Sequence, residues 1–316
     1  MLTALSLACE STPDLAATMR LQIPALAWHM TGAGVWQRTF HLHGQGIRVR
    51  VEADRGGLQF SFRTGTDEEL LRDLLIATFR NGEQVGAMAL TGHPALRALR
   101  RHHQGMILLA GSPFETLVLA VLAQARPAAA VRKVFPRLAA ECGGLTPRRL
   151  SELPLPRLAQ LVRPLGEVKA SRLHATAAIL TRRGATAFDR PIGGSDSHAL
   201  NYLLPSLPGV GTHTAAIVMA IVNDVPDTVP IDQHLMRVAY RLGLTDHDGG
   251  LTKPGSRRVA ADLLAYGPDV ARAHPLIQHV AYDTCTASTP DCRRCFLAES
   301  CRYAARTRVM PGPVRV

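Results

Sequence analysis

The stretch that decides the fold reads Leu207-Pro208-Gly209-Val210-Gly211, continues through an apolar run, and then reads Val229-Pro230-Ile231-Asp232 before a second helical pattern that ends at Gly243. Gly209 and Gly211 lack a Cβ atom, so the backbone can turn sharply there and approach another surface closely. Backbone N–H groups at such a turn, next to a helix N-terminus, form an anion site. The stretch therefore predicts a hairpin that binds an anion, followed by a carboxylate at the start of the next helix.

This stretch resembles the core of the helix-hairpin-helix (HhH-GPD) DNA glycosylases of the endonuclease III type. Those proteins carry a pattern like L-P-G-V-G-x-K and, further along, V-D-T-H-x-x-R-V-x-x-R-L-G. This chain reads Leu207-Pro208-Gly209-Val210-Gly211-Thr212-His213 and Ile231-Asp232-Gln233-His234-Leu235-Met236-Arg237-Val238-Ala239-Tyr240-Arg241-Leu242-Gly243. The family lysine is replaced by His213. The resemblance implies a catalytic pair, Asp232 and His213, and a DNA-binding hairpin that consists of Leu207, Gly209, Val210, Gly211 and Thr212.

The composition indicates a folded, basic protein. The chain has 316 residues, 47% of them hydrophobic, and a formal net charge of +11, which favours a polyanionic partner. The lysines are few, namely Lys133, Lys169 and Lys253. The sequence has no apolar run long enough to span a membrane and no basic leader at its start. We therefore expect a cytoplasmic, nucleoid-associated monomer of prokaryotic type that does not bind membranes.

The first third of the chain has the alternation of β-strands. Residues 36–43, 47–51 and 58–62 are separated by glycine turns, which predicts an antiparallel sheet. Helices are expected to begin at Asp67 and at His93-Pro94. The arrangement resembles the N-terminal domain of the alkyl-purine and 8-oxoguanine glycosylases, which endonuclease III itself lacks.

From Ser112 the chain turns helical. Ser112 is a candidate N-cap and Glu115 stands three residues later, as in a capping box. The helix resembles the family segment P-F-E-x-L-V-x-A-I-L-x-Q, which ends at a loop that pushes side chains into DNA. The resemblance places Gln124 and Arg126 in that loop as DNA-binding residues; the alternative is an ordinary polar helix end. The adenine-mismatch branch carries a glutamate at the position of Ala120, so its absence argues against that activity.

The segments that follow are short helices separated by prolines at 147, 154, 156 and 164. Leu165-Gly166-Glu167-Val168-Lys169-Ala170 resembles a shortened form of the family's G-x-x-x-K-A segment. A loop rich in Gly, Pro and Ser is expected over residues 189–197.

Four cysteines near the end of the chain have the spacing C-x6-C-x2-C-x5-C: Cys285, Cys292, Cys295 and Cys301. Four thiolates can hold an iron–sulfur cluster, whereas zinc ribbons use two C-x2-C pairs and only one is present here. Disulfides fit poorly without an export signal. The spacing is similar to that of the endonuclease III cluster loop, so we expect a [4Fe-4S] cluster rather than zinc.

The chemistry that the resemblance implies is the cleavage of an N-glycosidic bond. Positive charge develops on the sugar, and a carboxylate beside it stabilises that charge and orients a water molecule. Asp232 suits this role, although an aspartate in this position also suits a helix N-cap. The bifunctional relatives use an amine where this chain has His213, and imidazole forms no stable Schiff base. His213 is expected in the nucleotide pocket, with inert filling of space as the alternative.

Together these observations predict an α+β, mostly α protein: an all-helical helix-hairpin-helix glycosylase body with an N-terminal antiparallel β-sheet domain and a C-terminal [4Fe-4S] loop. The expected domains are residues 1–110, 111–230 and 231–316. The expected activity is that of a base-excision-repair DNA glycosylase that hydrolyses the bond to a flipped, damaged base in double-stranded DNA and, having His213, is monofunctional. Two alternatives stay open: a catalytically weak protein that binds lesions or abasic sites, and a bifunctional glycosylase and lyase with another amine.

Overall fold

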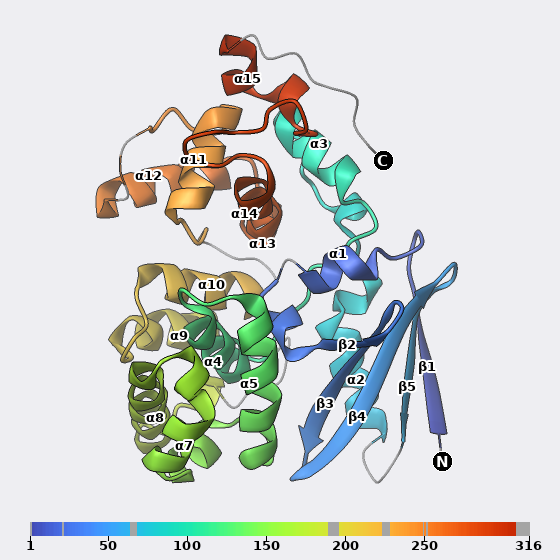
Figure 1. The fold of residues 1–316 in the computed structure, drawn as a ribbon, viewed down its shortest axis with the longest axis vertical. Helices are drawn as coiled ribbons and strands as arrows, with labels where there is room; N and C mark the ends of the chain where they lie inside the picture. The colour runs from blue at the N-terminus through green and yellow to red at the C-terminus, as the bar shows by residue number, and fades with distance from the viewer. Residues whose placement is uncertain are drawn as a thin grey trace. The chain divides into compact units, whose positions relative to one another are not determined.

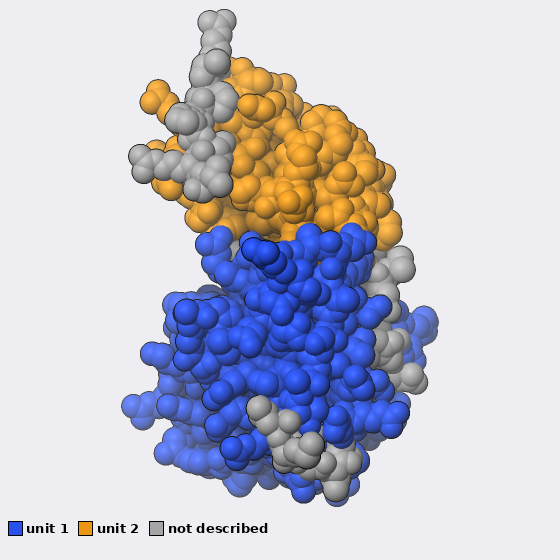
Figure 2. All heavy atoms as spheres, turned by 90° about the vertical axis from the view of Figure 1, so that its right-hand side faces the viewer, with its two compact units in different colours: residues 1–83, 107–224 blue, residues 84–106, 225–316 orange. Residues whose placement is uncertain are grey.

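A computed structural model describes residues 2–20, 22–63, 68–188, 196–222, 228–248, 250 and 252–307. Contacts between Cα atoms group the chain into two units, which Figure 2 colours separately: unit 1 comprises residues 1–83 and 107–224, and unit 2 comprises residues 84–106 and 225–316. The division into domains 1–110, 111–230 and 231–316 stays a prediction. Most of the loop expected over residues 189–197 lies outside the described residues.

Unit 1 begins with a five-stranded antiparallel sheet in the order β1-β5-β4-β3-β2 (Figure 1). Its strands are β1 (Leu2–Ala8), β2 (His29–Gly32), β3 (Val35–Leu42), β4 (Gln45–Asp54) and β5 (Gly57–Arg63). The three strands expected from sequence are confirmed as β3, β4 and β5. Strand β1 was not anticipated; it pairs with β5, so that Leu5 lies opposite Phe60 and Leu7 opposite Leu58.

The buried face of the sheet belongs to one core with the helices of unit 1. Helix α2 (Glu68–Thr78) lies across the sheet (Figure 1), and Trp28 packs edge-on against Phe40 and Phe79 at ring-centroid distances of 5.9 and 5.6 Å. Trp28 is fully buried and Phe114 is 1% exposed. Both aromatic side chains are therefore core residues.

A buried ion pair joins the sheet to the helical part of unit 1. Arg38 on β3 donates to Glu115 on α4 (Pro113–Ala123) at 2.5 Å, and both side chains are largely buried. The expected capping box is therefore wrong: Ser112 is the N-cap residue, but its side chain makes no capping hydrogen bond. Glu115 is engaged by an arginine from the sheet, and such a distant partner competes with the local cap.

The remaining helices of unit 1 are mostly short, as the prolines predicted. They are α1 (Leu15–Arg20), η1 (Pro24–Ala27), η2 (Arg80–Gly82), α5 (Ala128–Glu141), α6 (Pro147–Glu152), α7 (Leu155–Val162), η4 (Arg163–Leu165), α8 (Glu167–Arg182), η5 (Thr186–Phe188), α9 (Ser197–Leu203), η6 (Leu204–Ser206) and α10 (Thr212–Val222). Prolines stand in the first turn of several of them, where the missing N–H has no helical partner to lose.

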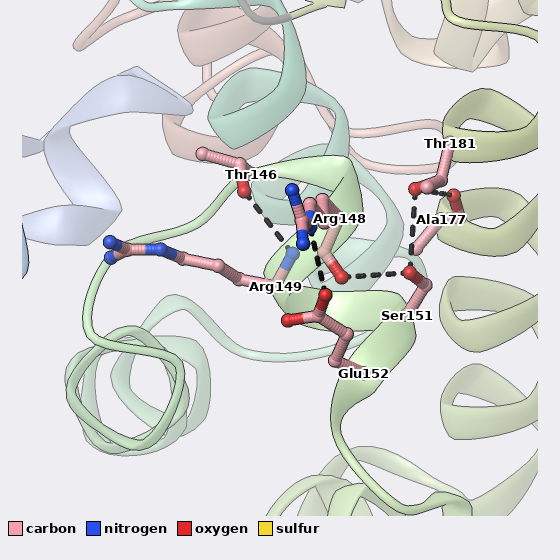
Figure 3. A network of polar contacts seen from close by, with 7 residues as sticks. All are labelled: Thr146, Arg148, Arg149, Ser151, Glu152, Ala177 and Thr181. Carbon is pink, nitrogen blue, oxygen red and sulfur yellow. Dashed lines mark hydrogen bonds and ion pairs between the residues drawn. The ribbon is translucent and has the colours of Figure 1, made fainter.

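Local polar contacts stabilise α6, and one of them reaches the neighbouring α8 (Figure 3). Thr146 caps α6 by accepting from the Arg149 N–H at 3.2 Å, and Arg148 pairs with Glu152 one turn on. The Ser151 hydroxyl donates to the Arg148 carbonyl and lies 3.3 Å from the Thr181 hydroxyl on α8. Because the Arg148–Glu152 pair is exposed, it stabilises α6 only slightly.

The regular elements of the described part of unit 2 are helices, joined by turns and by the loop that carries the cysteines. Its helices are η3 (Val85–Ala87), α3 (Pro94–His102), α11 (Gln233–Leu242), α12 (Lys253–Leu264), α13 (Asp269–Arg272), α14 (His274–Asp283), η7 (Ala298–Ser300) and α15 (Arg302–Arg306). Helix α3 starts at His93-Pro94 as expected. In the described parts of both units, no helix is long and apolar enough to span a membrane.

Lys169 ties α8 to the C-terminal end of α4. Lys169 is 8% exposed, and its Nζ donates to the carbonyl oxygens of Val121, Leu122 and Gln124 at 3.0, 2.8 and 2.6 Å. Those carbonyls lie at the negative end of the helix dipole, where a cation is favourable. Burial, and then the nearby Arg126 and Arg172 guanidinium groups, lower the pKa of Lys169 to about 8.

Removal of this buried amine should destabilise the fold. We expect Lys169→Met to lower the free energy of unfolding by about 2–4 kcal/mol, because several carbonyls lose a charged donor. Lys133→Met, at an exposed position of α5, is the matched control and should change it by less than about 0.5 kcal/mol. Urea unfolding at pH 7 measures both; equal effects of the two variants would show that Lys169 does not hold α4.

The lowered pKa adds a second expectation with a definite sign. Between pH 8 and the ordinary lysine pKa of about 10.5, the folded protein binds fewer protons at Lys169 than the unfolded chain. The wild type should therefore gain stability relative to Lys169→Met as the pH rises through this window. Urea unfolding of both proteins at pH 7.5 and pH 10 measures the difference, and a fall in that difference would contradict the lowered pKa.

Candidate functional site

The hairpin of residues 207–211 connects η6 to α10 in unit 1. Leu207 and Val210 are buried and anchor it, and the Val210 N–H donates to the Leu207 carbonyl at 3.1 Å. Gly209 has a φ of +78°, and a Cβ atom there would stand 2.6 Å from Arg172 Cδ. Glycine at 209 is therefore required by the fold itself, through both backbone conformation and packing.

Gly211 differs from Gly209, because no other residue packs against the place where a side chain would lie. It is exposed, and a Cβ atom there would meet nothing within 4 Å. The first helical hydrogen bond of α10 runs from the Ala215 N–H to the Gly211 carbonyl at 2.9 Å, so the amides of Gly211 and Thr212 precede the helical ladder. They stand at the positive end of the helix dipole, which suits an anion.

Two distant side chains brace the hairpin. Gln124, which follows α4, donates through Nε2 to the Gly209 carbonyl at 3.0 Å and to the Thr214 hydroxyl at 2.9 Å. Thr176 on α8 donates to the Pro208 carbonyl at 3.2 Å. The structure thus brings Gln124 to the predicted hairpin, but as a brace, a role that sequence reasoning missed.

The loop after α4 is held in an uncommon conformation. Ala125 has a φ of +52°, which is rare for a residue with a side chain. Arg126 donates through Nε to the Leu165 carbonyl at 2.8 Å. The guanidinium group is thereby tied to the turn before α8 and, with Gln124, fixes the path of the loop.

His213 occupies the first turn of α10, where the resemblance places the family lysine. The residue is half buried and follows the exposed Thr212. Of the chain's three lysines, Lys169 is engaged by three carbonyls, while Lys133 lies on α5 and Lys253 begins α12. The hairpin and the first turn of α10 therefore contain no primary amine.

Asp232 lies in unit 2, at the N-cap of α11. Its Oδ1 accepts from the Leu235 N–H at 2.7 Å, so the cap predicted from sequence is present. Its Oδ2 accepts from Gln278 Nε2 on α14 at 2.5 Å. The carboxylate is half buried, and each of its oxygens has a donor. Since an ionised carboxylate has about four acceptor sites, each oxygen keeps capacity for a further partner.

Aromatic side chains flank this carboxylate. His234 and Tyr282 lie with ring centroids 4.6 Å apart, and Tyr282 is 60% exposed. Burial, and then the negative charge of Asp232, raise the pKa of Tyr282. Sequence reasoning missed Gln278 and Tyr282, because nothing in the local pattern of α14 distinguishes them.

The four cysteines of the tail come together. Cys285, Cys292, Cys295 and Cys301 line one small cavity. Burial raises the pKa of the Cys292 thiol, and the charges of the other three cysteines raise it further. Among the described residues, no three His, Cys, Asp or Glu side chains lie close enough together to hold a single metal ion. A four-iron cluster instead takes one thiolate per iron, so cysteines spread around a cavity suit its chemistry.

Helix α11 connects Asp232 to the cysteine loop. Arg237 donates to the Cys285 carbonyl at 3.0 Å, and Arg241 donates to the carbonyls of Thr286 and Ala287 at 2.7 and 2.8 Å. The Cys301 thiol donates to the Arg241 carbonyl at 3.3 Å. Helix α11 thus holds the carboxylate at its N-cap and contacts the cysteine loop through its later turns.

Known proteins resemble this chain in sequence and in fold. Residues 118–262 match the family model of the HhH-GPD superfamily base excision DNA repair protein. Endonuclease III of Treponema pallidum (strain Nichols) is 35% identical over 161 residues, which are 49% of this chain and 68% of that protein.

Two solved structures share the fold. The structure of MBOgg1 in complex with a low-affinity DNA ligand has a TM-score of 0.67 at 16% identity, covering 88% of this chain and 94% of that one. The 3-methyladenine DNA glycosylase from Archaeoglobus fulgidus has a TM-score of 0.63 at 16% identity, covering 88% and 97%. At 88% coverage the likeness extends into the N-terminal third, so the expected likeness of the N-terminal domain is confirmed at the level of fold. On the identity to the Treponema protein and the family match, the chain belongs to the endonuclease III family of HhH-GPD base excision repair proteins, and it is a DNA glycosylase.

Proposed function

We propose that this glycosylase removes a damaged base from double-stranded DNA by hydrolysis, with Asp232 as the catalytic carboxylate and water as the nucleophile. The observation that carries the proposal is the state of Asp232: both oxygens are held by donors while acceptor capacity remains. A positioned anion of this kind stabilises a sugar that becomes cationic as the base leaves. The remaining capacity suits a water molecule, whose proton passes to the carboxylate as its oxygen bonds to C1′.

The hairpin supports a role in DNA binding. Its exposed Gly211 and Thr212 amides suit a phosphate oxygen, and the chain carries a net charge of +11. The turn is anchored by the buried Leu207 and Val210 and by the packed Gly209. His213 follows Thr212 in the first turn of α10. Gln124 and Arg126 stay predictions as residues that enter the DNA, since each is bound to protein carbonyls here.

The absence of an amine from the hairpin supports a monofunctional enzyme. A lyase of the family type needs a primary amine that attacks C1′ and forms a Schiff base. His213 cannot supply one, and the amine of Lys169 is engaged at the end of α4. Base release should therefore leave an intact abasic strand.

We also infer that Cys285, Cys292, Cys295 and Cys301 hold a [4Fe-4S] cluster. Their shared cavity and the mutual effect of their charges support this, because a cationic metal centre relieves the repulsion among four thiolates. When bound, the cluster cross-links four points of the tail. Arg237 and Arg241 then join that tail to α11.

The two hairpin glycines provide a first test. Gly211→Ala should keep the fold, since its Cβ meets nothing, but should weaken binding to an abasic-analogue duplex roughly ten- to hundredfold, because the added methyl group keeps a phosphate oxygen away from the amides and a hydrogen bond to a charged group contributes about 1.5–3 kcal/mol. Gly209→Ala should instead lower the melting temperature, because of strain and the Arg172 contact. Fluorescence anisotropy and thermal unfolding measure the two effects.

The control for Gly211→Ala is Gly32→Ala in β2, where a Cβ atom also meets nothing. It should change neither affinity nor stability. Wild-type affinity should also fall about a thousandfold or more between 50 and 200 mM salt, as expected for six or more phosphate contacts. If Gly211→Ala binds like the wild type, the hairpin amides do not contact the phosphate.

The second test concerns Asp232. Asp232→Asn keeps the cap and the shape but loses the charge, so single-turnover base release should fall about 10²–10³-fold. Affinity for an abasic-analogue duplex should be retained, because the hairpin is untouched. The substrates are duplexes that carry one oxidised pyrimidine, one alkylated purine or one 8-oxoguanine, and the duplex that the wild type cleaves fastest is used.

Each remaining hypothesis has its own outcome in this assay. Unchanged base release by Asp232→Asn would leave Asp232 with the cap alone. Covalent trapping of the wild type on DNA by borohydride would identify a bifunctional enzyme with another amine. Tight binding without release from any of the duplexes would identify a lesion-binding protein. Trapping that appears only in His213→Lys would support the monofunctional assignment.

The third test concerns the cluster. Protein purified without oxygen should contain four iron and four sulfide ions per chain, the content of a [4Fe-4S] cluster, and absorb broadly in the visible range. Cys292→Ser should lower the iron content and the melting temperature, whereas Cys142→Ser, at a cysteine of unit 1, should retain the iron. Stoichiometric zinc with no iron in the wild type would refute the cluster.

A further inference from the structure

We propose that Gln278 is a positioning residue for the glycosylase reaction, which acts by holding the Asp232 carboxylate in one orientation and in its charged form. This inference rests on the proposed role of Asp232 and deepens it. Gln278 touches the carboxylate directly, at 2.5 Å from its Nε2 to Oδ2. No feature of the hairpin, the cysteine loop or the capping pattern of α11 accounts for a glutamine at this place.

The geometry fixes the carboxylate from two helices. The α11 backbone holds Oδ1 through the Leu235 N–H at 2.7 Å, and α14 holds Oδ2 through Gln278. With the cap alone, the carboxylate plane can rotate about the bond between Cβ and Cγ while one oxygen stays near its donor. Two donors from different elements remove that freedom, and catalytic groups depend on such fixed orientation.

Helix α14 is itself well anchored, so Gln278 presents its amide from a rigid support. Leu276, Ile277, Val280 and Ala281 are buried, and α14 packs against α11. Gln278 is half buried on the same helix, one turn before the exposed Tyr282. The amide is therefore presented to Asp232 by a helix whose own position is fixed by the core of unit 2.

The choice of a neutral donor has an electrostatic consequence. The titratable and charged groups linked to Asp232 within unit 2 include Tyr282 on α14, whose ring lies against that of His234 on α11, and Arg237, which contacts His234. An amide donor favours the ionised carboxylate without adding charge of its own. A lysine or arginine in its place would neutralise the anion that the cationic sugar needs, and a glutamate would repel it. Glutamine therefore keeps the full negative charge available.

The test compares Gln278→Leu, which keeps the volume and removes the donor, with Gln278→Glu, which keeps the shape and adds a carboxyl group. Single-turnover base release at pH 7 should fall about tenfold or more in both variants. The acid limb of the pH–rate profile should move to higher pH in Gln278→Leu and further in Gln278→Glu, because the carboxylate loses a donor and then gains a negative neighbour. Affinity for an abasic-analogue duplex should be retained.

A merely structural link between α11 and α14 would give a different pattern. It would change the melting temperature of both variants and leave the acid limb in place. The matched control is Gln160→Leu on α7, an exposed glutamine that accepts from Arg157, and it should match the wild type in rate and profile. A double variant provides a further readout. In an Asp232→Asn background, Gln278→Leu should not lower the rate of base release any further, whereas the two reductions in rate would multiply if they were independent.

The outcomes separate this inference from the proposed function. If Asp232→Asn loses activity while Gln278→Leu matches the wild type in rate and acid limb, the role of Gln278 is refuted and that of Asp232 stands. If Asp232→Asn keeps full activity, or the wild type releases no base, both are refuted. A loss in Gln278→Leu with an unmoved acid limb, or one that multiplies with Asp232→Asn, would also overturn the positioning role.

Discussion

The hydrogen bond from the Leu235 N–H to Asp232 is the contact on which the rest of this site depends, because it fixes a carboxylate at the first turn of α11. The positive end of the helix dipole and the Gln278 amide both favour the charged form. The other end of α11 is held by the tail through Arg241 and the Cys301 thiol. We propose that the cysteine loop supports the reaction indirectly, because its contacts help to hold the C-terminal end of the helix that carries Asp232 at its N-cap.

The hairpin of residues 207–211 is held at one glycine and exposed at the other. Gly209 packs tightly against Arg172 and is bound by Gln124, whereas Gly211 faces open space. Lys169 also supports the hairpin indirectly, because its Nζ binds the carbonyl of Gln124 at the C-terminal end of α4. A buried amine in this role is then unavailable for Schiff-base chemistry. The same lysine thus supports both the fold and the assignment of water as the nucleophile.

The sequence allowed the elements to be predicted, but not their distant partners. Alternating residues indicated β3, β4 and β5, and a cap followed by a helical pattern indicated α11, because these signals are local. Strand β1 was missed, since its short alternation acquires meaning only opposite β5. The capping box at Glu115 failed because Arg38, far away in the sequence, engages that carboxylate. The Gln124 brace and the Gln278 contact join segments that are likewise remote, so no spacing in the chain reveals them.

We propose that base release passes through a cationic sugar beside Asp232 and is completed by water rather than by an amine. Base release in buffer that contains methanol is the decisive measurement, because methanol can replace water at C1′ and pass its proton to the carboxylate. We expect an abasic strand with a methoxy group in place of the C1′ hydroxyl, heavier by one CH2 unit in mass spectrometry, in a share that grows with the methanol concentration. Base release that yields no methylated strand, together with protein that borohydride fixes to the DNA, would contradict it.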